Sequence, residues 1–225
     1  LLARYEADGD LQSPQVASAI QALSSAEFDS DPGMATVLES LLQQRQSARE
    51  PIAAIDDLID GSSPTFRGVA FEPGTGRSDQ LPADERHLHV RKLMSFVDHD
   101  ERLLSLSADP ALLDVVSRLM NGATPELFQD MALLKPPGGS EKPWHQDMAY
   151  FNVPIDTTVV GVWIALDAAT TANGALHVLP GSHQRGPRFH FKRRDWQICD
   201  SEAPRGTDMI VPLPPGGAFL WHGLT

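Results

Sequence analysis

The stretch TVVGVWIALDAATTANGALHVLP, residues 158–180, decides the fold class because it holds two short apolar runs separated by a turn. TVVGVWIAL (158–166) and GALHVLP (174–180) are rich in the β-branched and aromatic residues that strands favour. Between them, TTANG (170–174) supplies turn residues, and its final glycine suits a backbone with positive φ. The pattern predicts two strands joined by a short connection.

Runs of the same kind lie on both sides of this stretch. FQDMALLK (128–135) precedes it, GGAFLWHGL (216–224) follows it, and turn-forming PPGG and PLPPGG lie between the runs. Short strands that alternate with short turn segments are typical of an antiparallel sandwich or barrel. We therefore expect a mainly β or α+β protein with its β core over about residues 125–225.

The N-terminal half shows helical periodicity instead. Apolar residues recur at helical spacing in four segments, which are predicted as helices at 13–23, 34–42, 52–59 and 110–121. Asp109 and Pro110 form a plausible start for the last of them, and a short strand is expected near FRGVAF (66–71). We expect one domain over residues 1–225, with a helical part at about 1–124 that braces the β core.

The composition narrows the classes of partner. The 225 residues carry 18 Lys and Arg against 30 Asp and Glu, a net charge of −12, which disfavours nucleic acid and anionic membrane surfaces as partners. No apolar run approaches the roughly 18 residues of a membrane span. One cysteine cannot form an internal disulfide, which fits a reducing compartment. We expect a cytoplasmic protein that acts on a small molecule, and the sequence leaves its oligomeric state open.

PWHQDMAYF, residues 143–151, places two metal-capable side chains at i and i+2. If WHQDM is a strand, His145 and Asp147 project from the same face. An imidazole nitrogen and a carboxylate oxygen suit a divalent transition metal. A His–Asp hydrogen bond without a metal is the alternative interpretation.

A third ligand is expected from another strand. His222 in GGAFLWHGL is the best candidate, because it follows a turn and an apolar run and shares a face with Ala218 and Leu220. Two histidines and one carboxylate form the facial triad of non-haem iron(II) oxygenases. A structural zinc site would require four ligands, usually including cysteines, and is disfavoured here.

The sequence resembles the phytanoyl-CoA dioxygenase family of Fe(II)- and 2-oxoglutarate-dependent oxygenases. The resemblance rests on RKL (91–93), MALLKPPGG (131–139), EKPWHQDMAYF (141–151), GVWIALDAATTANGALHVLPGSH (161–183) and GGAFLWHG (216–223). It implies a double-stranded β-helix (jelly-roll, cupin-like) core braced by N-terminal helices. It also implies Fe(II) as cofactor, 2-oxoglutarate as cosubstrate and O2 as oxidant.

The resemblance assigns roles residue by residue. His145, Asp147 and His222 match the iron ligands. Residues that match positions near the cosubstrate or substrate are Lys92, Met131, Trp163 and Gln146. The aromatic residues Tyr150 and Phe151 are placed to wall the site, although packing alone would also explain them. Asp147 stands where halogenating relatives carry a small residue, so the resemblance implies oxygen insertion.

Two departures from the family pattern lead to further expectations. Relatives carry an arginine for 2-oxoglutarate on a strand after the distal histidine, so the chain is expected to continue past Thr225. Residues are also expected to be missing near Gly9 and Asp10.

The predicted activity is hydroxylation of an organic substrate, coupled to decarboxylation of 2-oxoglutarate to succinate and CO2. The alternatives are a cupin-like oxygenase that does not use 2-oxoglutarate and a degenerate family member without catalysis. The polar stretch 186–208 is interpreted as a lid or substrate-selecting loop.

Overall fold

The computed structural model describes residues 48–75, 81–202, 206 and 208–225. The helices predicted at 13–23 and 34–42, and the expectation about Gly9 and Asp10, lie outside these residues. A helix covers residues 48–60, and the further helices are α4 (Ala83–Arg86), α5 (Glu101–Ser107) and α6 (Pro110–Leu119). The strands are β1 (Val69–Phe71), β2 (Val90–Met94), β3 (Met131–Leu133), β4 (Val160–Ile164), β5 (Leu176–Val178), β6 (Phe191–Lys192), β7 (Trp196–Gln197), β8 (Met209–Val211) and β9 (Ala218–His222).

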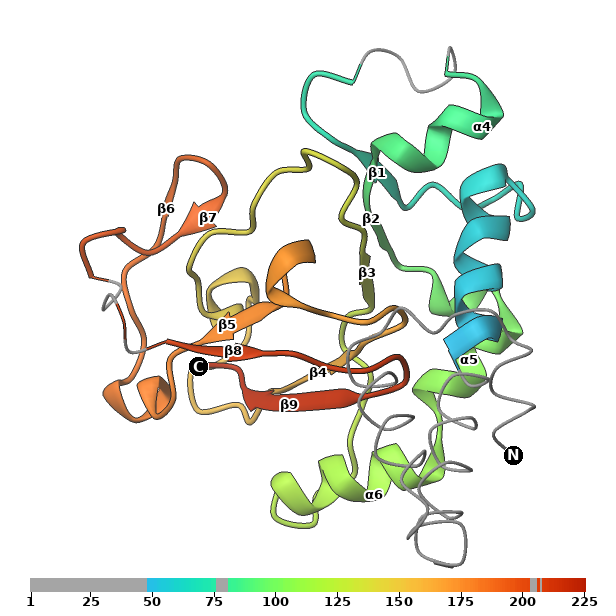
Figure 1. Ribbon diagram of the computed structural model, residues 1–225. Helices are drawn as coiled ribbons and strands as arrows, with labels where there is room; N and C mark the ends of the chain where they lie inside the picture. The colour runs from blue at the N-terminus through green and yellow to red at the C-terminus, as the bar shows by residue number, and fades with distance from the viewer. Residues whose placement is uncertain (1–47, 76–80, 203–205, 207) are drawn as a thin grey trace, which may run out of the picture.

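All pairings among the described strands are antiparallel. One sheet has the order β1-β2-β3, and three two-stranded sheets pair β4 with β9, β5 with β8, and β6 with β7. The predicted combination of helices with antiparallel strands is therefore confirmed. The part expected to be helical, about 1–124, also contains β1 and β2, and β2 pairs with β3, the first strand of the C-terminal part. This sheet joins the two parts of the chain (Figure 1).

The main hydrophobic core lies between the helix over residues 48–60 and the β1-β2-β3 sheet (Figure 1). Leu93 of β2 is fully buried, and Leu58 and Ile59 cover it from the helix. The spacing of Ile55, Leu58 and Ile59 places these side chains on one helix face, as the sequence pattern predicts. Lys92 lies next to Leu93 on the strand, so its side chain projects from the opposite face of the sheet.

Side-chain caps fix the helices and turns around this core. Asp109 accepts the N–H groups of Ala111 and Leu112 at the start of α6, which confirms the predicted start. The carboxylate of Asp130 accepts three successive backbone N–H groups, those of residues 95–97, at 2.8, 2.5 and 2.7 Å. Asp130 thereby ties the end of β2 to the approach to β3.

No helix among the described residues is long and apolar enough to cross a bilayer.

The connection between β4 and β5 is the turn that the sequence predicts. A short 3-10 helix, Thr171–Asn173, is closed by a capping box between Thr170 and Asn173. Gly174 follows with φ of 87°, in the left-handed region where glycine has no steric cost. This turn sets β5 beside β8 rather than beside β4.

Candidate functional site

The segment that carries His145 and Asp147 is not a β-strand, contrary to the sequence prediction. Trp144 lies in a bend, and a 3-10 helix begins at Asp147 and runs to Tyr150. Gln146, between the two residues, has an extended backbone, with φ of −109° and ψ of 135°. One extended residue is enough to send its two neighbours to the same side. The Nε2 of His145 consequently lies 3.3 Å from the Oδ1 of Asp147.

The hydrogen bonds of His145 show which ring nitrogen is available. Its Nδ1–H donates to the carbonyl oxygen of Pro143 at 2.8 Å, so Nε2 of the neutral ring carries the lone pair. Nε2 and Asp147 Oδ1 are then two acceptors that face each other, and a proton or a metal cation between them would satisfy both. A bond from the other ring N–H to a backbone carbonyl is typical of metal-bound histidine.

The separation of these two atoms also suits a metal. Two ligand atoms about 2.1 Å from one ion and at right angles to each other are about 3 Å apart. The observed 3.3 Å lies close to this value. A proton on His145 would satisfy the same pair, as the alternative interpretation requires. The pair thus fits two adjacent positions of a divalent metal site.

His222 does not complete this pair in the structure. Along β9, Phe219 and Trp221 project from one face, and Ala218, Leu220 and His222 from the other. Trp221 bonds to Asp147, so the face that carries His222 is turned away from the pair. The imidazole of His222 is exposed, stacks on His183 with 5.4 Å between ring centroids, and accepts the N–H of Leu224.

The predicted three-residue triad is therefore not assembled. Within the described parts of residues 48–225, no group of three His, Cys, Asp or Glu side chains stands close enough to hold a metal. Alternation along the strand predicts that His222 shares a face with Ala218 and Leu220, but the direction of that face depends on packing. Gly161, opposite Trp221 on β4, leaves the space into which the indole ring fits, and this turns the other face of β9 outward.

Gln146 lies on the opposite side of the segment from the His–Asp pair and is buried. Its side-chain amide donates to the carbonyl oxygens of Gly186 and Leu224, and its Oε1 accepts the N–H of Arg188. Its backbone N–H donates to Nε2 of His190. These bonds make Gln146 an anchor between the segment that carries His145 and Asp147, the stretch after β5 and the end of β9. A substrate contact for Gln146 stays a prediction.

Tyr150 stands beside His145, with its ring edge-on to the imidazole and 5.5 Å between centroids. Its hydroxyl accepts from Nζ of Lys142 at 2.7 Å and donates to the carbonyl oxygen of Trp196 at 2.8 Å. Lys142 also pairs with Asp195 at 2.8 Å. Burial raises the pKa of Tyr150 even though Lys142 acts against it. Phe151, the next residue, packs edge-to-face on Phe128.

The residues matched to the cosubstrate pocket come from two sheets. Lys92 is paired with Leu133 across β2 and β3, and Met94 is paired with Met131. Lys92 and Met94 are two positions apart on β2 and paired residues share a face, so Lys92 and Met131 lie on the same sheet face. Trp163 on β4 is paired with Phe219 and shares the face of Trp221. Burial lowers the pKa of Lys92, and the positive charge of Lys142 adds to this effect. Lys92 thus experiences the electrostatic field of the Tyr150–Lys142 group beside His145.

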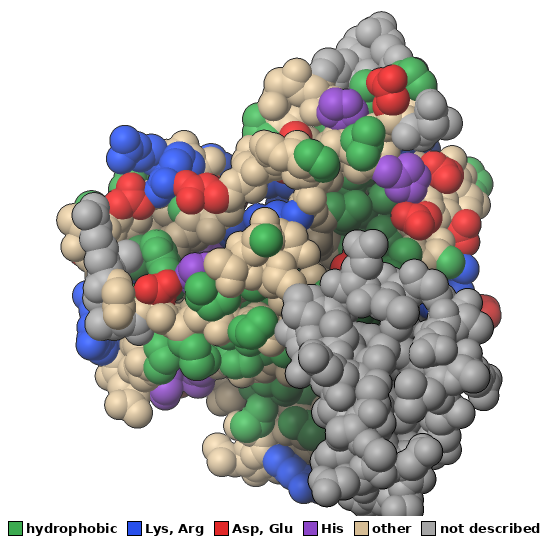
Figure 2. Space-filling view, in the orientation of Figure 1, with side chains coloured by type: hydrophobic (Ala, Val, Ile, Leu, Met, Phe, Trp, Pro, Cys, Tyr) green, Lys and Arg blue, Asp and Glu red, His purple; other side chains and the backbone are tan. Residues whose placement is uncertain are grey.

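The β6–β7 hairpin, within the predicted lid, is attached to the segment that carries His145 and Asp147. Trp196 Nε1–H donates to the carbonyl oxygen of Ala149, and the backbone N–H of Ile198 donates to the carbonyl oxygen of Trp144. Basic side chains gather over this hairpin among acidic ones (Figure 2). Arg194 pairs with Glu141 and Asp200, so this charge is already matched by protein carboxylates.

Several residues that shape the site were not predicted from the sequence. Lys142, Asp195 and Trp221 all contact predicted site residues or their partners. Lys142 lies only three positions before His145, and this proximity was the available signal. Asp195 and Trp221 come from distant positions, and only the tertiary fold brings them close.

His190 gives the site a dependence on pH. Its Nδ1–H donates to the carbonyl oxygen of Arg188 and its Nε2 accepts from Gln146 N–H, so both nitrogens are used by the neutral ring. Burial lowers the pKa of His190. A histidine that is harder to protonate in the folded protein stabilises the fold at pH values above the pKa it has in the unfolded chain. This stabilisation is lost as pH falls below that pKa. We expect the free energy of unfolding, measured by urea titration at a series of pH values, to fall as pH drops below about 6.5, the ordinary histidine pKa.

His190→Phe is the variant that isolates this effect. At about pH 7.5 it leaves the buried N–H of Gln146 without an acceptor, which costs about 1–3 kcal/mol. Below about pH 6.5, the ordinary histidine pKa, the variant should lose less further stability than the wild type. His222→Asn is the comparison variant: burial and His183 lower the pKa of that histidine as well, so this variant separates the contribution of His222 from that of His190. An equal pH dependence in wild type and His190→Phe would contradict the assignment.

The sequence is similar to those of several known proteins. The chain is 32% identical over 135 residues to mouse phytanoyl-CoA dioxygenase domain-containing protein 1, covering 56% of this chain and 46% of the relative. It is 41% identical over 105 residues to Arabidopsis thaliana phytanoyl-CoA dioxygenase, covering 44% and 36%. It is 31% identical over 125 residues to bovine peroxisomal phytanoyl-CoA dioxygenase, covering 54% and 35%. The chain therefore spans less than half the length of these curated relatives.

A family model extends the match to most of the sequence. The model described as phytanoyl-CoA dioxygenase (PhyH) matches residues 35–225, which include His145, Asp147 and all the described strands. The chain belongs to the phytanoyl-CoA dioxygenase family.

Proposed function

We propose that this protein is an Fe(II)- and 2-oxoglutarate-dependent dioxygenase that hydroxylates a small organic substrate on a double-stranded β-helix core. The observation that carries the proposal is the pair of facing acceptors, His145 Nε2 and Asp147 Oδ1, 3.3 Å apart. Family membership supports an oxygenase rather than another metalloenzyme. A cytoplasmic location belongs to the same proposal.

The roles of the residues follow from their chemistry. His145 and Asp147 would hold the metal through one nitrogen and one oxygen. Bound iron with 2-oxoglutarate supplies the oxidising chemistry, which inserts one oxygen atom of O2 into a C–H bond and yields succinate and CO2. Lys92 offers a positive charge to the cosubstrate, with Met131 on the same sheet face. Tyr150, which contacts the ring of His145, is placed to exclude water and orient the substrate.

The test is an anaerobic titration of 2-oxoglutarate into Fe(II)-loaded protein, followed by the visible metal-to-ligand charge-transfer band. The wild type should give a band that saturates, and His145→Ala should give none because it lacks the imidazole ligand. Lys92→Ala should need more 2-oxoglutarate to reach half-saturation. Thermal melts of the variants control for loss of fold.

The two alternatives give different results in the same experiment. Bound iron without a band would favour the cupin-like oxygenase that does not use 2-oxoglutarate. Failure to bind iron would favour a family member without catalysis. The latter alternative has one observation in its favour, since the described residues bring only two protein ligands together.

A further inference from the structure

The two carboxylate oxygens of Asp147 have different surroundings. Oδ1 lies 3.3 Å from Nε2 of His145, and Oδ2 accepts the indole Nε1–H of Trp221 at 3.0 Å. The indole N–H can only donate, so it holds Oδ2 in place as an acceptor. This bond fixes the rotation of the carboxylate, and Oδ1 becomes the oxygen that stands beside His145.

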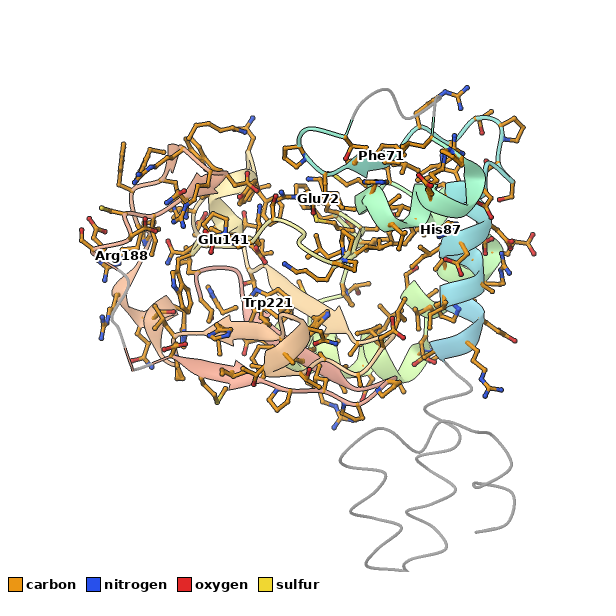
Figure 3. The ribbon with its side chains drawn as sticks, turned by 45° about the horizontal axis from the view of Figure 1, so that its top comes forward. Phe71, Glu72, His87, Glu141, Arg188 and Trp221 are labelled. Atoms are coloured by element: carbon orange, nitrogen blue, oxygen red, sulfur yellow. The ribbon has the colours of Figure 1, made fainter. Side chains whose placement is uncertain are left out.

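The position of Trp221 is itself determined by packing. Trp221 is paired with Gly161 across β4 and β9, and a Cβ atom at Gly161 would lie 2.3 Å from Cε2 of the indole. The ring therefore occupies space that any larger residue at 161 would remove. Phe219, two residues earlier on the same face, stacks beside it at 5.9 Å with 18° between planes. Figure 3 shows Trp221 in the interior, above the β4–β9 pair.

We propose that Trp221 is a positioning residue for the metal site. Its indole holds Asp147 so that this carboxylate would bind the metal through Oδ1 alone. The inference rests on the proposed function, because it concerns the same metal. Its physical basis is that partners of metal ligands set ligand orientation, and their removal typically weakens metal binding about 10–100-fold. Gly161 has a supporting role, because it makes room for the indole ring.

Mn(II) alone is a suitable probe, since the free ion can be counted by electron paramagnetic resonance. Trp221→Phe keeps an aromatic ring over Gly161 but removes the donor, and it should weaken Mn(II) binding about 10-fold or more. Gly161→Ala keeps the donor but displaces the ring, and it should weaken binding as well. Trp196→Phe is the matched control, because it removes an indole bond to a backbone carbonyl, that of Ala149. Its loss of Mn(II) affinity should be smaller than that of Trp221→Phe, because its bond holds a backbone carbonyl of the segment and not a carboxylate oxygen of Asp147.

A second measurement tests the hydrogen bond without any metal. In a ¹H–¹⁵N spectrum, the indole signal of Trp221 should move when Asp147 is replaced by alanine. If it does not move, or if Trp221→Phe binds Mn(II) as the wild type does, the positioning role is overturned while the proposed function stands. If the wild type does not bind Mn(II), the proposed function fails first, and the metal role of Trp221 fails with it. A purely structural role for Trp221 would change the melting temperature but not the Mn(II) affinity of folded protein.

Discussion

Asp147→Asn is expected to abolish metal binding without weakening the fold. The amide would turn its oxygen toward the Trp221 N–H, which needs an acceptor, and its NH2 group toward Nε2 of His145. That NH2 group would donate to the lone pair that the metal requires. We expect Fe(II) affinity and 2-oxoglutarate turnover to fall more than about 100-fold, since loss of even an outer partner costs about 10–100-fold.

The same substitution should leave the metal-free protein as stable as the wild type, or more stable. It replaces two facing acceptors by a donor and an acceptor, so the local hydrogen bonding improves. Fe(II)-dependent consumption of 2-oxoglutarate and urea unfolding of the metal-free protein measure the two effects. Asp156→Asn, at an exposed position, is the control and should change neither. A marked loss of stability in Asp147→Asn would show that the carboxylate has a structural role instead.

Leu93→Ala is expected to have the largest effect on stability. Leu93 is fully buried, and it lies on the central strand of the β1-β2-β3 sheet, between Val69 and Ala132 on the neighbouring strands. Truncating a leucine in such a position leaves a cavity that the surroundings fill only in part, and this typically costs about 2–5 kcal/mol.

Urea titration of purified protein measures this cost as a shift of the midpoint. The matched control is Leu88→Ala, the same substitution at a side chain that is 56% exposed, which should stay within about 0.5 kcal/mol of the wild type. A cost below about 1 kcal/mol for Leu93→Ala, well under the usual range for a buried leucine, would mean that this core repacks easily. Because the sheet carries Lys92 on its other face, a partly folded variant should also bind 2-oxoglutarate poorly.

Local patterns in the sequence predicted local structure well. The helix over residues 48–60, the start of α6 at Asp109 and the turn at Gly174 all follow from side chains within a few positions. Each of these features depends on helical periodicity, capping or a left-handed backbone, which neighbouring residues decide. Strands β1, β3, β4, β5 and β9 lie in runs that were predicted as strands, whereas β2, β6, β7 and β8 were not predicted.

The arrangement of the site depended on contacts that no local pattern contains. Alternation along β9 predicts that His222 and Trp221 face opposite ways, but not which of them faces inward. That choice follows from the space above Gly161, on a strand far earlier in the chain. The His145–Asp147 geometry was predicted for a strand, and it holds without one because a single extended residue has the same effect.

The anchoring of Gln146 has a consequence for how the protein folds. Its bonds join it to residues 40, 42, 44 and 78 positions later in the chain. Such contacts require closure of long loops before they contribute any energy, and proteins rich in them fold slowly. We therefore expect the His145–Asp147 segment to become fixed late on the folding pathway, because Gln146 gains its bond to Leu224 only after the C-terminal strands have met.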